Sequence, residues 1–275
     1  MIQIGLRDVN FAHVFSSSGW NIPQYFNWCR TTINNKICFF TDYCLDSVEN
    51  VQAEKKIAWL LEPPAINQDC YNYIRNYNNQ FDYVLTYDRS LVDNNKILFY
   101  PLGGCWIPDI GDQRNRPHMV NIHPKKYLIS IIASNKNSTV GHQLRHMIVN
   151  RCSGLTAFGP RYKTLEFKED ALVDYMFSIV VENSIFDDYF TEKLIDCFAV
   201  GTIPIYWGTK NIHKYFNING MLTFNNLSEL DDIIKTLSPE LYNNKLQYVT
   251  DNFDRHFRYR TPENWIFEQY PQLFS

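Results

Sequence analysis

The most constraining feature of this sequence is the segment of residues 177–208, FSIVVENSIFDDYFTEKLIDCFAVGTIPIYWG. It opens with a short apolar run rich in β-branched residues, which is typical of a strand buried on both faces. After an acidic and aromatic turn, apolar residues recur along one face of an amphipathic helix. Gly201 stands where a glycine commonly ends a helix, and residues 203–206 are expected to form the next strand. This order predicts a βαβ unit, and open α/β sheets bind ligands outside the carboxyl ends of such strands.

The turn between this strand and the helix carries the charges. A carboxylate at Asp187 or Asp188 can accept the free N–H groups of a first helical turn, so we expect one of them to cap the helix. Glu192 and Lys193 fall in that first turn, near the positive end of the helix dipole. A phosphate held there would receive backbone N–H groups and the Lys193 ammonium. The alternative is an ordinary βαβ unit with a charged first turn.

The combined pattern of E-N-S, D-Y-x-T-E-K and G-x-I-P-I-Y-W-G separates these interpretations. It resembles the donor-binding signature of the α-1,3/1,4-fucosyltransferases, glycosyltransferase family 10, with bacterial members most similar over residues 202–208. Weaker resemblance extends over residues 56–237. The resemblance implies a GT-B-like α/β fold, in which two Rossmann-type domains face each other across a cleft. It also implies an inverting enzyme that transfers L-fucose from GDP-fucose to a glycan hydroxyl.

The resemblance places the nucleotide sugar against the turn of residues 187–193. Tyr189 and Glu192 match family positions that contact the nucleotide sugar, and a carboxylate such as Glu192 can accept both ribose hydroxyls. Glu182 and Asn183 follow the strand, where polar side chains reach the cleft. The alternative for these two residues is a structural network that orients the turn.

A basic residue on the next expected helix completes the donor site. Arg145 follows the A-S-N turn of residues 133–135 and resembles the phosphate-binding arginine of the family. An arginine can grip two phosphate oxygens at once. The alternative for Arg145 is a solvated helix charge.

The base is expected from the first half of the chain. The segment KIAWLLEPPAIN resembles the E-S-P region of the family, whose glutamate acts as the acceptor base, and this matches Glu62. Pro63 stands where serine is commoner. A partly dry cleft would raise the pKa of the Glu62 carboxyl toward the useful range. Alternatively, Glu62 is a surface residue at a strand end, with Asp42 and His13 as the other candidate bases.

No metal or cofactor is expected. The sequence has no Asp-x-Asp triplet, so Arg145 and Lys193 are the groups that would neutralise the leaving diphosphate. His142 and His146 have helical spacing but lack the glutamate of a zinc hydrolase motif between them. The missing G-x-G-x-x-G fingerprint disfavours a third possibility, an NAD-dependent oxidoreductase.

Two α/β halves are expected. Residues 1–115 would form the acceptor-binding Rossmann-like domain with its linker, and residues 125–250 the nucleotide-sugar-binding one. Residues 251–275 would pack back on the first domain. Segments expected to be strands are 2–6, 36–41, 56–61, 83–86, 97–101, 127–133, 157–159, 177–181 and 203–206. Helical segments are expected within 19–32 after Pro23, and at 67–78, 141–151, 171–176 and 226–237, with residues 103–124 as the interdomain linker.

The net charge of the chain limits the classes of partner that we expect. A net charge of −3 creates no global attraction to nucleic acid or anionic membranes, so the expected partners are the donor and a glycan acceptor. No run of about 18 apolar residues and no signal-peptide pattern occurs, which predicts a cytoplasmic enzyme of bacterial or viral type. The remaining rivals are the same scaffold with another nucleotide sugar and a non-catalytic sugar-nucleotide or glycan-binding relative.

Overall fold

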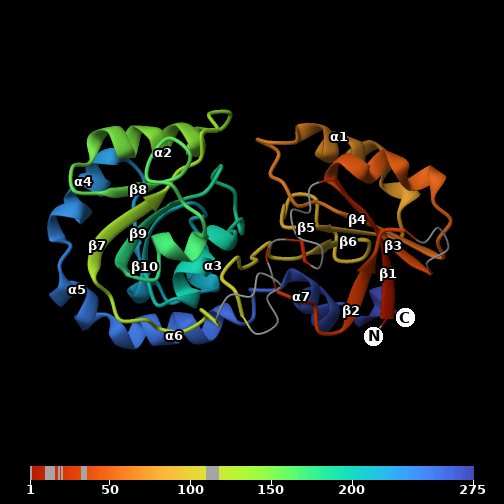
Figure 1. Cartoon of the computed structure of the whole chain (residues 1–275). Helices are drawn as coiled ribbons and strands as arrows, with labels where there is room; N and C mark the ends of the chain where they lie inside the picture. Colours follow the sequence, from red (N-terminus) through yellow and green to blue (C-terminus); the bar gives the residue numbers. More distant parts are fainter. Residues whose placement is uncertain (1, 10–15, 18, 20, 32–35, 110–117) are drawn as a thin grey trace.

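Two parallel β-sheets stand side by side in the computed structural model, which describes residues 2–9, 16–17, 19, 21–31, 36–109 and 118–275 (Figure 1). The first sheet has the strand order β2-β1-β3-β4-β5-β6, and the second has the order β11-β10-β9-β7-β8. All strand pairs in both sheets are parallel. The fold is therefore α/β and GT-B-like, as predicted.

The first sheet is buried on both faces, as parallel sheets usually are. Phe39 and Trp59 point into a cluster shared with the second half, whereas their neighbours Phe40 and Ala58 pack on the other side. The strands are β1 (Ile2–Arg7), β2 (Phe26–Cys29), β3 (Ile37–Thr41), β4 (Lys55–Trp59), β5 (Tyr83–Thr86) and β6 (Ile97–Phe99). The helical elements of this half are η1 (Asp42–Asn50), α1 (Gln68–Tyr77) and η2 (Asn78–Gln80).

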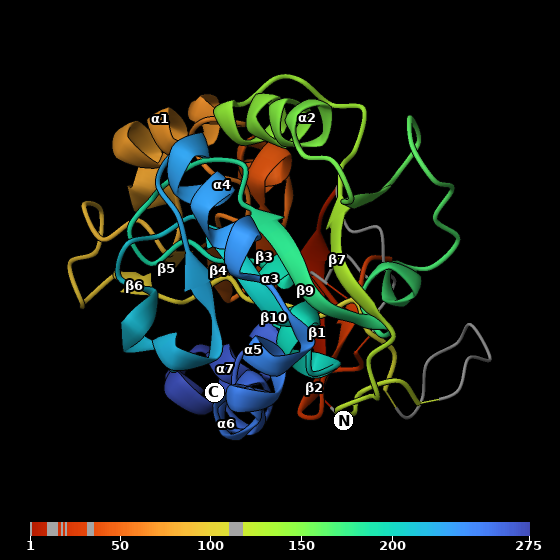
Figure 2. The same cartoon turned by 90° about the vertical axis from the view of Figure 1, so that its left-hand side faces the viewer.

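The second sheet has its own outer core beneath α2, α4, α5 and α6 (Figure 2). Its strands are β7 (Tyr127–Ile132), β8 (Thr156–Phe158), β9 (Tyr175–Val181), β10 (Ile203–Trp207) and β11 (Leu222–Thr223). The α-helices are α2 (Val140–Arg151), α3 (Glu192–Ala199), α4 (Leu227–Thr236), α5 (Pro239–Asn244) and α6 (Leu246–His256). Short 3₁₀ segments are η3 (Lys168–Ala171), η4 (Ile212–Lys214) and η5 (Ile218–Gly220).

The end of α3 follows the sequence prediction. Gly201 has a φ of +70°, and the N–H of Thr202 donates to the carbonyl of Cys197 at 2.9 Å. The N–H of Gly201 donates to Phe198 at 3.2 Å, which completes the pair of bonds that defines a Schellman motif. This stop turns the chain directly into β10 between β9 and β11.

The helix predicted after Pro23 is wrong, because residues 26–29 form the edge strand β2. Phe26 pairs with Ile2 of β1 in parallel register, which leaves the backbone no intrahelical bonds. Its ring packs on Trp28 and Phe274, with centroids 4.8 and 5.1 Å away. Tertiary packing of these aromatic rings therefore overrides the local helical pattern.

The segment predicted as a helical turn at residues 171–176 is divided differently. The 3₁₀ turn η3 ends at Ala171, and β9 already begins at Tyr175. Tyr175 pairs with Tyr127 of β7, so the strand is longer than its apolar run.

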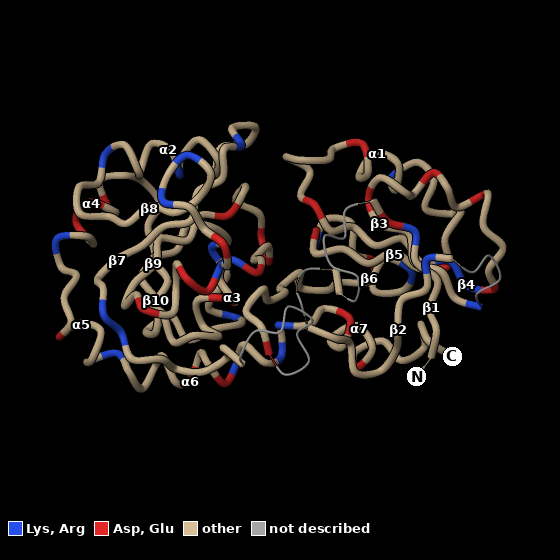
Figure 3. Tube along the Cα trace, in the orientation of Figure 1, with Lys and Arg blue, Asp and Glu red and all other residues tan. Residues whose placement is uncertain are grey.

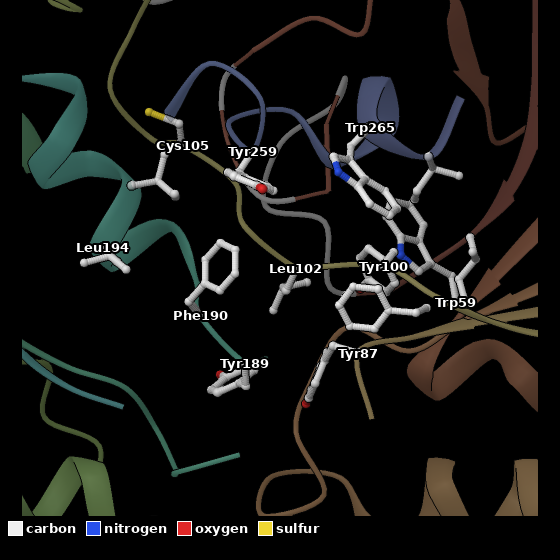
Figure 4. Packing of buried hydrophobic residues seen from close by; sticks show 14 of the residues in the cluster. Trp59, Tyr87, Tyr100, Leu102, Cys105, Tyr189, Phe190, Leu194, Tyr259 and Trp265 are labelled. Atoms are coloured by element: carbon white, nitrogen blue, oxygen red, sulfur yellow. The ribbon is translucent and has the colours of Figure 1, made fainter. Parts of the chain in front are cut away.

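The connection between the halves is packed rather than solvated over its described part. Ile107 is buried in the shared cluster, as are Leu102 and Cys105, which Figure 4 labels. Gly103 forms a parallel bridge with Thr191 of the second half, and Cys105 forms one with Gly19 of the first. Residues 110–117 of the expected linker lie outside the described residues. The packed stretch joins the two halves through one continuous core.

The C-terminal residues lie with the first half, near the N-terminus (Figure 1). Helix α6 runs through the domain boundary expected at residue 250, and α7 (Pro262–Gln269) and η6 (Pro271–Leu273) follow. Phe267 stacks on Tyr25 at 4.4 Å, and the carbonyl of Gln272 accepts from Lys55 Nζ at 2.6 Å. Within the described part of the chain, no helix is both long and apolar enough to cross a membrane.

Candidate active site

A cavity of about 790 Å³ lies between the two halves, at the carboxyl ends of strands from both sheets. Asp42 and Glu62, which follow β3 and β4, line it from the first half. Arg145, Glu192 and Lys193 line it from the second half. Figure 3 shows acidic and basic positions gathered along the trace around α3, where the second half faces the first. The cavity therefore has a carboxylate wall, defined by Asp42 and Glu62, and a cationic wall, defined by Arg145 and Lys193.

Thr191, and not Asp187 or Asp188, caps α3. Its hydroxyl oxygen accepts the N–H of Lys193 at 3.3 Å, so the predicted aspartate cap is wrong. The hydroxyl of Thr191 also donates to Glu182 Oε2 at 2.8 Å, and its N–H donates to Glu182 Oε1 at 2.9 Å. The cap is thereby tied to the end of β9.

Asp188 instead holds the two halves together. It has a φ of +61°, a conformation that aspartate tolerates better than most residues, and it is almost fully buried. Arg89 Nε of the first half donates to one of its oxygens at 2.9 Å, and the Tyr215 hydroxyl donates to the other at 2.6 Å. The N–H of Asp188 donates to Thr209 Oγ1 and to Asn211 Oδ1, each at 3.0 Å, and these bonds fix the turn itself.

Glu182 and Asn183 play different parts. Glu182 is fully buried beneath the turn and is absent from the cavity lining, so it acts as the scaffold of the α3 cap. Asn183 lines the cavity, and its side-chain oxygen accepts from Arg145 Nη2 at 2.9 Å. Of the two alternatives considered for this pair, the network describes Glu182, while Asn183 reaches the cavity.

Arg145 is a buried cation rather than a solvated helix charge. Its Nε and Nη2 donate to the carbonyl of Val181 at 3.0 and 2.5 Å. Burial lowers the pKa of Arg145, but a guanidinium remains charged in proteins. Helix α2 reaches this position because Gly141 lacks a Cβ, which would lie 1.8 Å from the carbonyl oxygen of Glu182.

The ammonium of Lys193 is surrounded by side-chain oxygens at the start of α3. Its Nζ is 3.1 Å from Thr191 Oγ1, 3.2 Å from Glu192 Oε1 and 3.7 Å from Glu182 Oε2. Burial alone would raise the pKa of Glu192, but Lys193 and Lys168 outweigh it and lower that pKa to about 2. Glu192 is therefore an ionised hydrogen-bond acceptor in the cavity.

Tyr189 joins the two halves at the cavity. Its ring is buried, lines the cavity and packs against Tyr87 of the first half with centroids 5.0 Å apart (Figure 4). The Tyr71 hydroxyl donates to the carbonyl of Glu62 at 3.0 Å, and because this uses its only proton, it accepts from the Tyr87 hydroxyl at 3.1 Å. Contacts through Tyr87 and Tyr71 thus link the turn of residues 187–193 to the backbone of Glu62.

Glu62 faces the cationic wall from the other side. Burial raises the pKa of its carboxyl, as expected, and Glu192 adds to this, while Lys193 and Lys136 act in the opposite direction. Asp42 lies behind it with a φ of +28° and accepts the N–H groups of Leu61 and Glu62 at 2.9 and 3.2 Å. Burial raises the pKa of Asp42 to about 7. His13, the third candidate base, lies outside the described residues.

Sequence reasoning missed a buried ion pair that supports the cationic wall. Lys168 of η3 lies 2.5 Å from Asp196 Oδ2 and 3.6 Å from Glu192 Oε1. Asp196 also accepts the N–H of Trp106, in the connection between the halves, at 2.6 Å. The available signal was a carboxylate in the middle of an otherwise apolar helix, because a buried charge requires a partner.

The described residues contain no group of three or more His, Cys, Asp and Glu side chains placed to hold a metal ion. A cleft between two parallel α/β sheets, with a raised-pKa carboxylate opposite paired cations, suits transfer of a group from a phosphorylated donor to a hydroxyl. Two parallel α/β sheets with the cavity between them define a GT-B-like fold.

Comparison with known proteins gives the family. The family model described as glycosyltransferase family 10 (fucosyltransferase), C-terminal part, matches residues 122–270. The chain therefore belongs to glycosyltransferase family 10, the fucosyltransferases.

Individual relatives agree with this assignment. The chain is 33% identical to the α-(1,3)-fucosyltransferase FucT of Helicobacter pylori over 120 residues, which are 41% of this chain and 25% of that protein. It is 23% identical to GDP-fucose protein O-fucosyltransferase 3 of Danio rerio over 226 residues, 70% of this chain and 47% of that protein. The chain thus spans between a quarter and a half of these curated relatives.

Solved structures support the fold. An α1,3-fucosyltransferase crystallised with GDP-fucose superposes with a TM-score of 0.55 at 21% identity, over 90% of this chain and 80% of that one. The structure of TarM superposes with a TM-score of 0.53 at 11% identity, over 88% of this chain and 55% of that one.

Proposed function

We propose that this chain transfers L-fucose from GDP-fucose to a glycan hydroxyl with inversion, and that it needs no metal ion. The observation that carries the proposal is the opposition of Glu62 to Arg145 and Lys193 across one cavity. A single displacement needs a base on one side of the sugar and a stabilised leaving group on the other. The second half would bind the nucleotide sugar, and the first half the acceptor.

The cationic wall receives the diphosphate. Arg145 is clamped by Val181 and Asn183, and Lys193 by the α3 cap, so both cations are fixed before the donor arrives. The N-terminal end of α3 adds the positive end of its dipole. Such preorganised charges stabilise the leaving group without reorganisation at the moment of reaction. Glu192 and Tyr189, which line the same part of the cavity, would hold the ribose and the sugar.

Glu62 activates the acceptor. Its carboxylate takes the proton of the acceptor hydroxyl while the hydroxyl oxygen forms a bond to C1 of fucose. The bond between C1 and the β-phosphate oxygen breaks with its electron pair leaving on GDP. The raised pKa makes Glu62 a stronger base than a solvated glutamate.

Asp42 is the weaker candidate for the base. Both of its oxygens already accept backbone N–H groups, from Leu61 and Glu62, and it is only 3% exposed. Those bonds fix the peptide that carries Glu62. We therefore assign Asp42 to positioning and Glu62 to proton transfer.

Relatives suggest a second acceptor class. The Danio rerio relative, named as a protein O-fucosyltransferase, aligns with 70% of this chain, whereas the Helicobacter pylori α-(1,3)-fucosyltransferase aligns with 41%. A protein hydroxyl is therefore the alternative to a glycan hydroxyl.

The test is a panel of nucleotide sugars with the purified chain and a chelator. Binding is followed by calorimetry and turnover by nucleotide release, first without an acceptor and then with glycan and protein acceptors. We expect binding of GDP and GDP-fucose and release of GDP. Preference for a UDP or dTDP sugar would keep the scaffold but discard fucose. Binding of no nucleotide sugar would contradict the proposal and favour a non-catalytic relative.

A further inference from the structure

His142 lies in the first turn of α2 and lines the same cavity as Arg145. It is only 4% exposed, so its ring is held in place by packing. Among the residues that the structure describes, no partner is found for its Nε2. A polar atom without a protein partner on a residue that lines a cavity is available to a ligand.

The tautomer of His142 follows from the helix cap. The backbone N–H of Thr139 points at His142 Nδ1 with an N···N distance of 3.3 Å, and the Ser138 hydroxyl lies 3.3 Å from the same nitrogen. A backbone N–H can only donate, so Nδ1 must accept. The proton of the neutral ring is therefore on Nε2, which becomes a hydrogen-bond donor.

The ring stays neutral because its surroundings oppose a further charge. Burial lowers the pKa of His142 to about 4, and Arg145, Lys136, Lys193 and His146 all act in the same direction. An imidazolium would also lose the bond from Thr139, since Nδ1 could no longer accept.

Two of the first amide groups of α2 are already bonded within the protein. The N–H of Gly141 already donates to the carbonyl of Asn183 at 3.1 Å, and that of His142 donates to Thr139 Oγ1 at 3.2 Å. Side-chain donors for a ligand are His142 Nε2–H and the guanidinium edge of Arg145, which lie one helical turn apart on the same face.

Resting on the proposed function, we infer that His142 donates a hydrogen bond from Nε2–H to the diphosphate of the sugar nucleotide. It acts beside Arg145 as a neutral donor in a cluster of cations. Such a donor helps to orient the phosphates through a directional hydrogen bond, and because it is neutral it adds no repulsion between the positive charges. The bond strengthens as negative charge builds up on the departing diphosphate.

Affinities for GDP and for guanosine separate this role from structural capping. His142→Leu should weaken GDP binding by about tenfold to a hundredfold, the cost of one hydrogen bond to a charged group, and leave guanosine binding within about twofold. His142→Gln should restore GDP affinity to within about threefold, because glutamine at this helix position can cap and still donate. The matched control is Thr139→Ala, which removes the cap acceptor but leaves the cavity lining unchanged.

A spectroscopic readout does not depend on the folding of any variant. In ¹⁵N-histidine spectra of the wild-type chain at neutral pH, one ring should show a protonated Nε2 whose exchange with water slows when GDP is added. Wild-type GDP binding with no such change, or equal GDP affinity in His142→Leu, would overturn the assignment of His142 alone. Equal losses of GDP and guanosine, or a GDP loss in Thr139→Ala as large as in His142→Leu, would show a capping role only and also overturn it. Failure of the wild-type chain to bind any nucleoside diphosphate would overturn the proposed function together with it.

Discussion

The two walls of the cavity are opposite in charge and are built in opposite ways. In the cationic wall, Lys193 belongs to the continuous motif of residues 177–208, and Arg145 is added from α2. The carboxylate wall takes Asp42 and Glu62 from the ends of two different strands. A site contiguous in sequence leaves a motif, whereas a site assembled from separate strand ends does not.

The walls also differ in how firmly their charges are fixed. Arg145 and Lys193 each contact several protein oxygens, and Glu182 beneath them is fully buried. Among the described residues, the carboxylate of Glu62 has no hydrogen-bond donor, and only its backbone is held, by Asp42 and Tyr71. This contrast suits the proposed roles, since the leaving-group site is preorganised and the base is free to meet different acceptors.

The largest expected effect tests the carboxylate wall. Glu62→Gln keeps the shape of the side chain but removes the proposed base, so transfer to an acceptor should fall by about 10²–10⁴-fold. GDP affinity should stay within about twofold, because the cationic wall is unchanged. Nucleotide release with acceptor and calorimetry with GDP measure the two quantities. The exposed Glu240→Gln serves as the matched control, and a comparable loss of GDP binding in Glu62→Gln would erase the contrast between the walls.

The same change on the cationic wall should act on the donor. Lys193→Met should lower the rate of GDP release by about 10²–10³-fold, the usual cost of losing one preorganised group that stabilises transition-state charge. Lys193→Arg should retain part of the rate because it keeps the charge. Melting curves check the fold, since the substitution leaves Glu182 with only its Thr191 bonds. Lys235→Met on the exposed face of α4 is the control, and equal rates in both methionine variants would refute the assignment.

A third prediction concerns how Asp42, which holds the backbone of Glu62, makes the stability of the chain depend on pH. The pKa of Asp42 is raised to about 7, so between pH 4 and 7 the folded chain holds a proton that the unfolded chain has released. Stability of the wild type should therefore fall as the pH rises through this window. Between pH 5 and 8 the loss relative to Asp42→Asn should be ~2–3 kcal/mol. Asparagine also tolerates the positive φ, and urea unfolding of both proteins at the two pH values gives the answer. Parallel pH profiles would mean that Asp42 is ionised in the folded chain.

The smallest effect tests the contact between the halves. Arg89→Ala removes the partner of the buried Asp188, but the Arg89 side chain is 49% exposed, so solvent screening limits the expected loss to about 1–2 kcal/mol. Arg151→Ala breaks a more exposed pair with Asp231 and should cost less than about 1 kcal/mol. Denaturant unfolding compares the two variants. Equal costs would show that the Arg89–Asp188 pair does not hold the halves together.

Structure is predicted best from the sequence where local periodicity and the packing of the whole fold favour the same element. The helix of α3, its glycine stop and the strands on either side follow from periodicity, and the same residues carry the family motif. Glu62, in contrast, required resemblance, because a glutamate after a strand has no distinguishing periodicity.

Prediction from the sequence fails where contacts between residues far apart in the chain determine the local structure. Phe26 becomes part of a strand because β1 and the C-terminal Phe274 lie beside it, and neither neighbour is visible in its local pattern. Asp188 leaves the cap position to Thr191 because Arg89, almost a hundred residues away, supplies its partner. Such pairings are set by the packing of the two halves, which no short window of sequence contains.

The central claim is that one wall holds the diphosphate and the other takes the proton. It is tested most directly by calorimetric titration of GDP into the wild type, Glu62→Gln and Lys193→Met under identical conditions. The account predicts that Glu62→Gln binds GDP like the wild type, while Lys193→Met binds it at least about tenfold more weakly, as loss of a charged hydrogen bond implies. Equal affinities in all three proteins, or equal losses in both variants, would contradict the division of labour between the two walls.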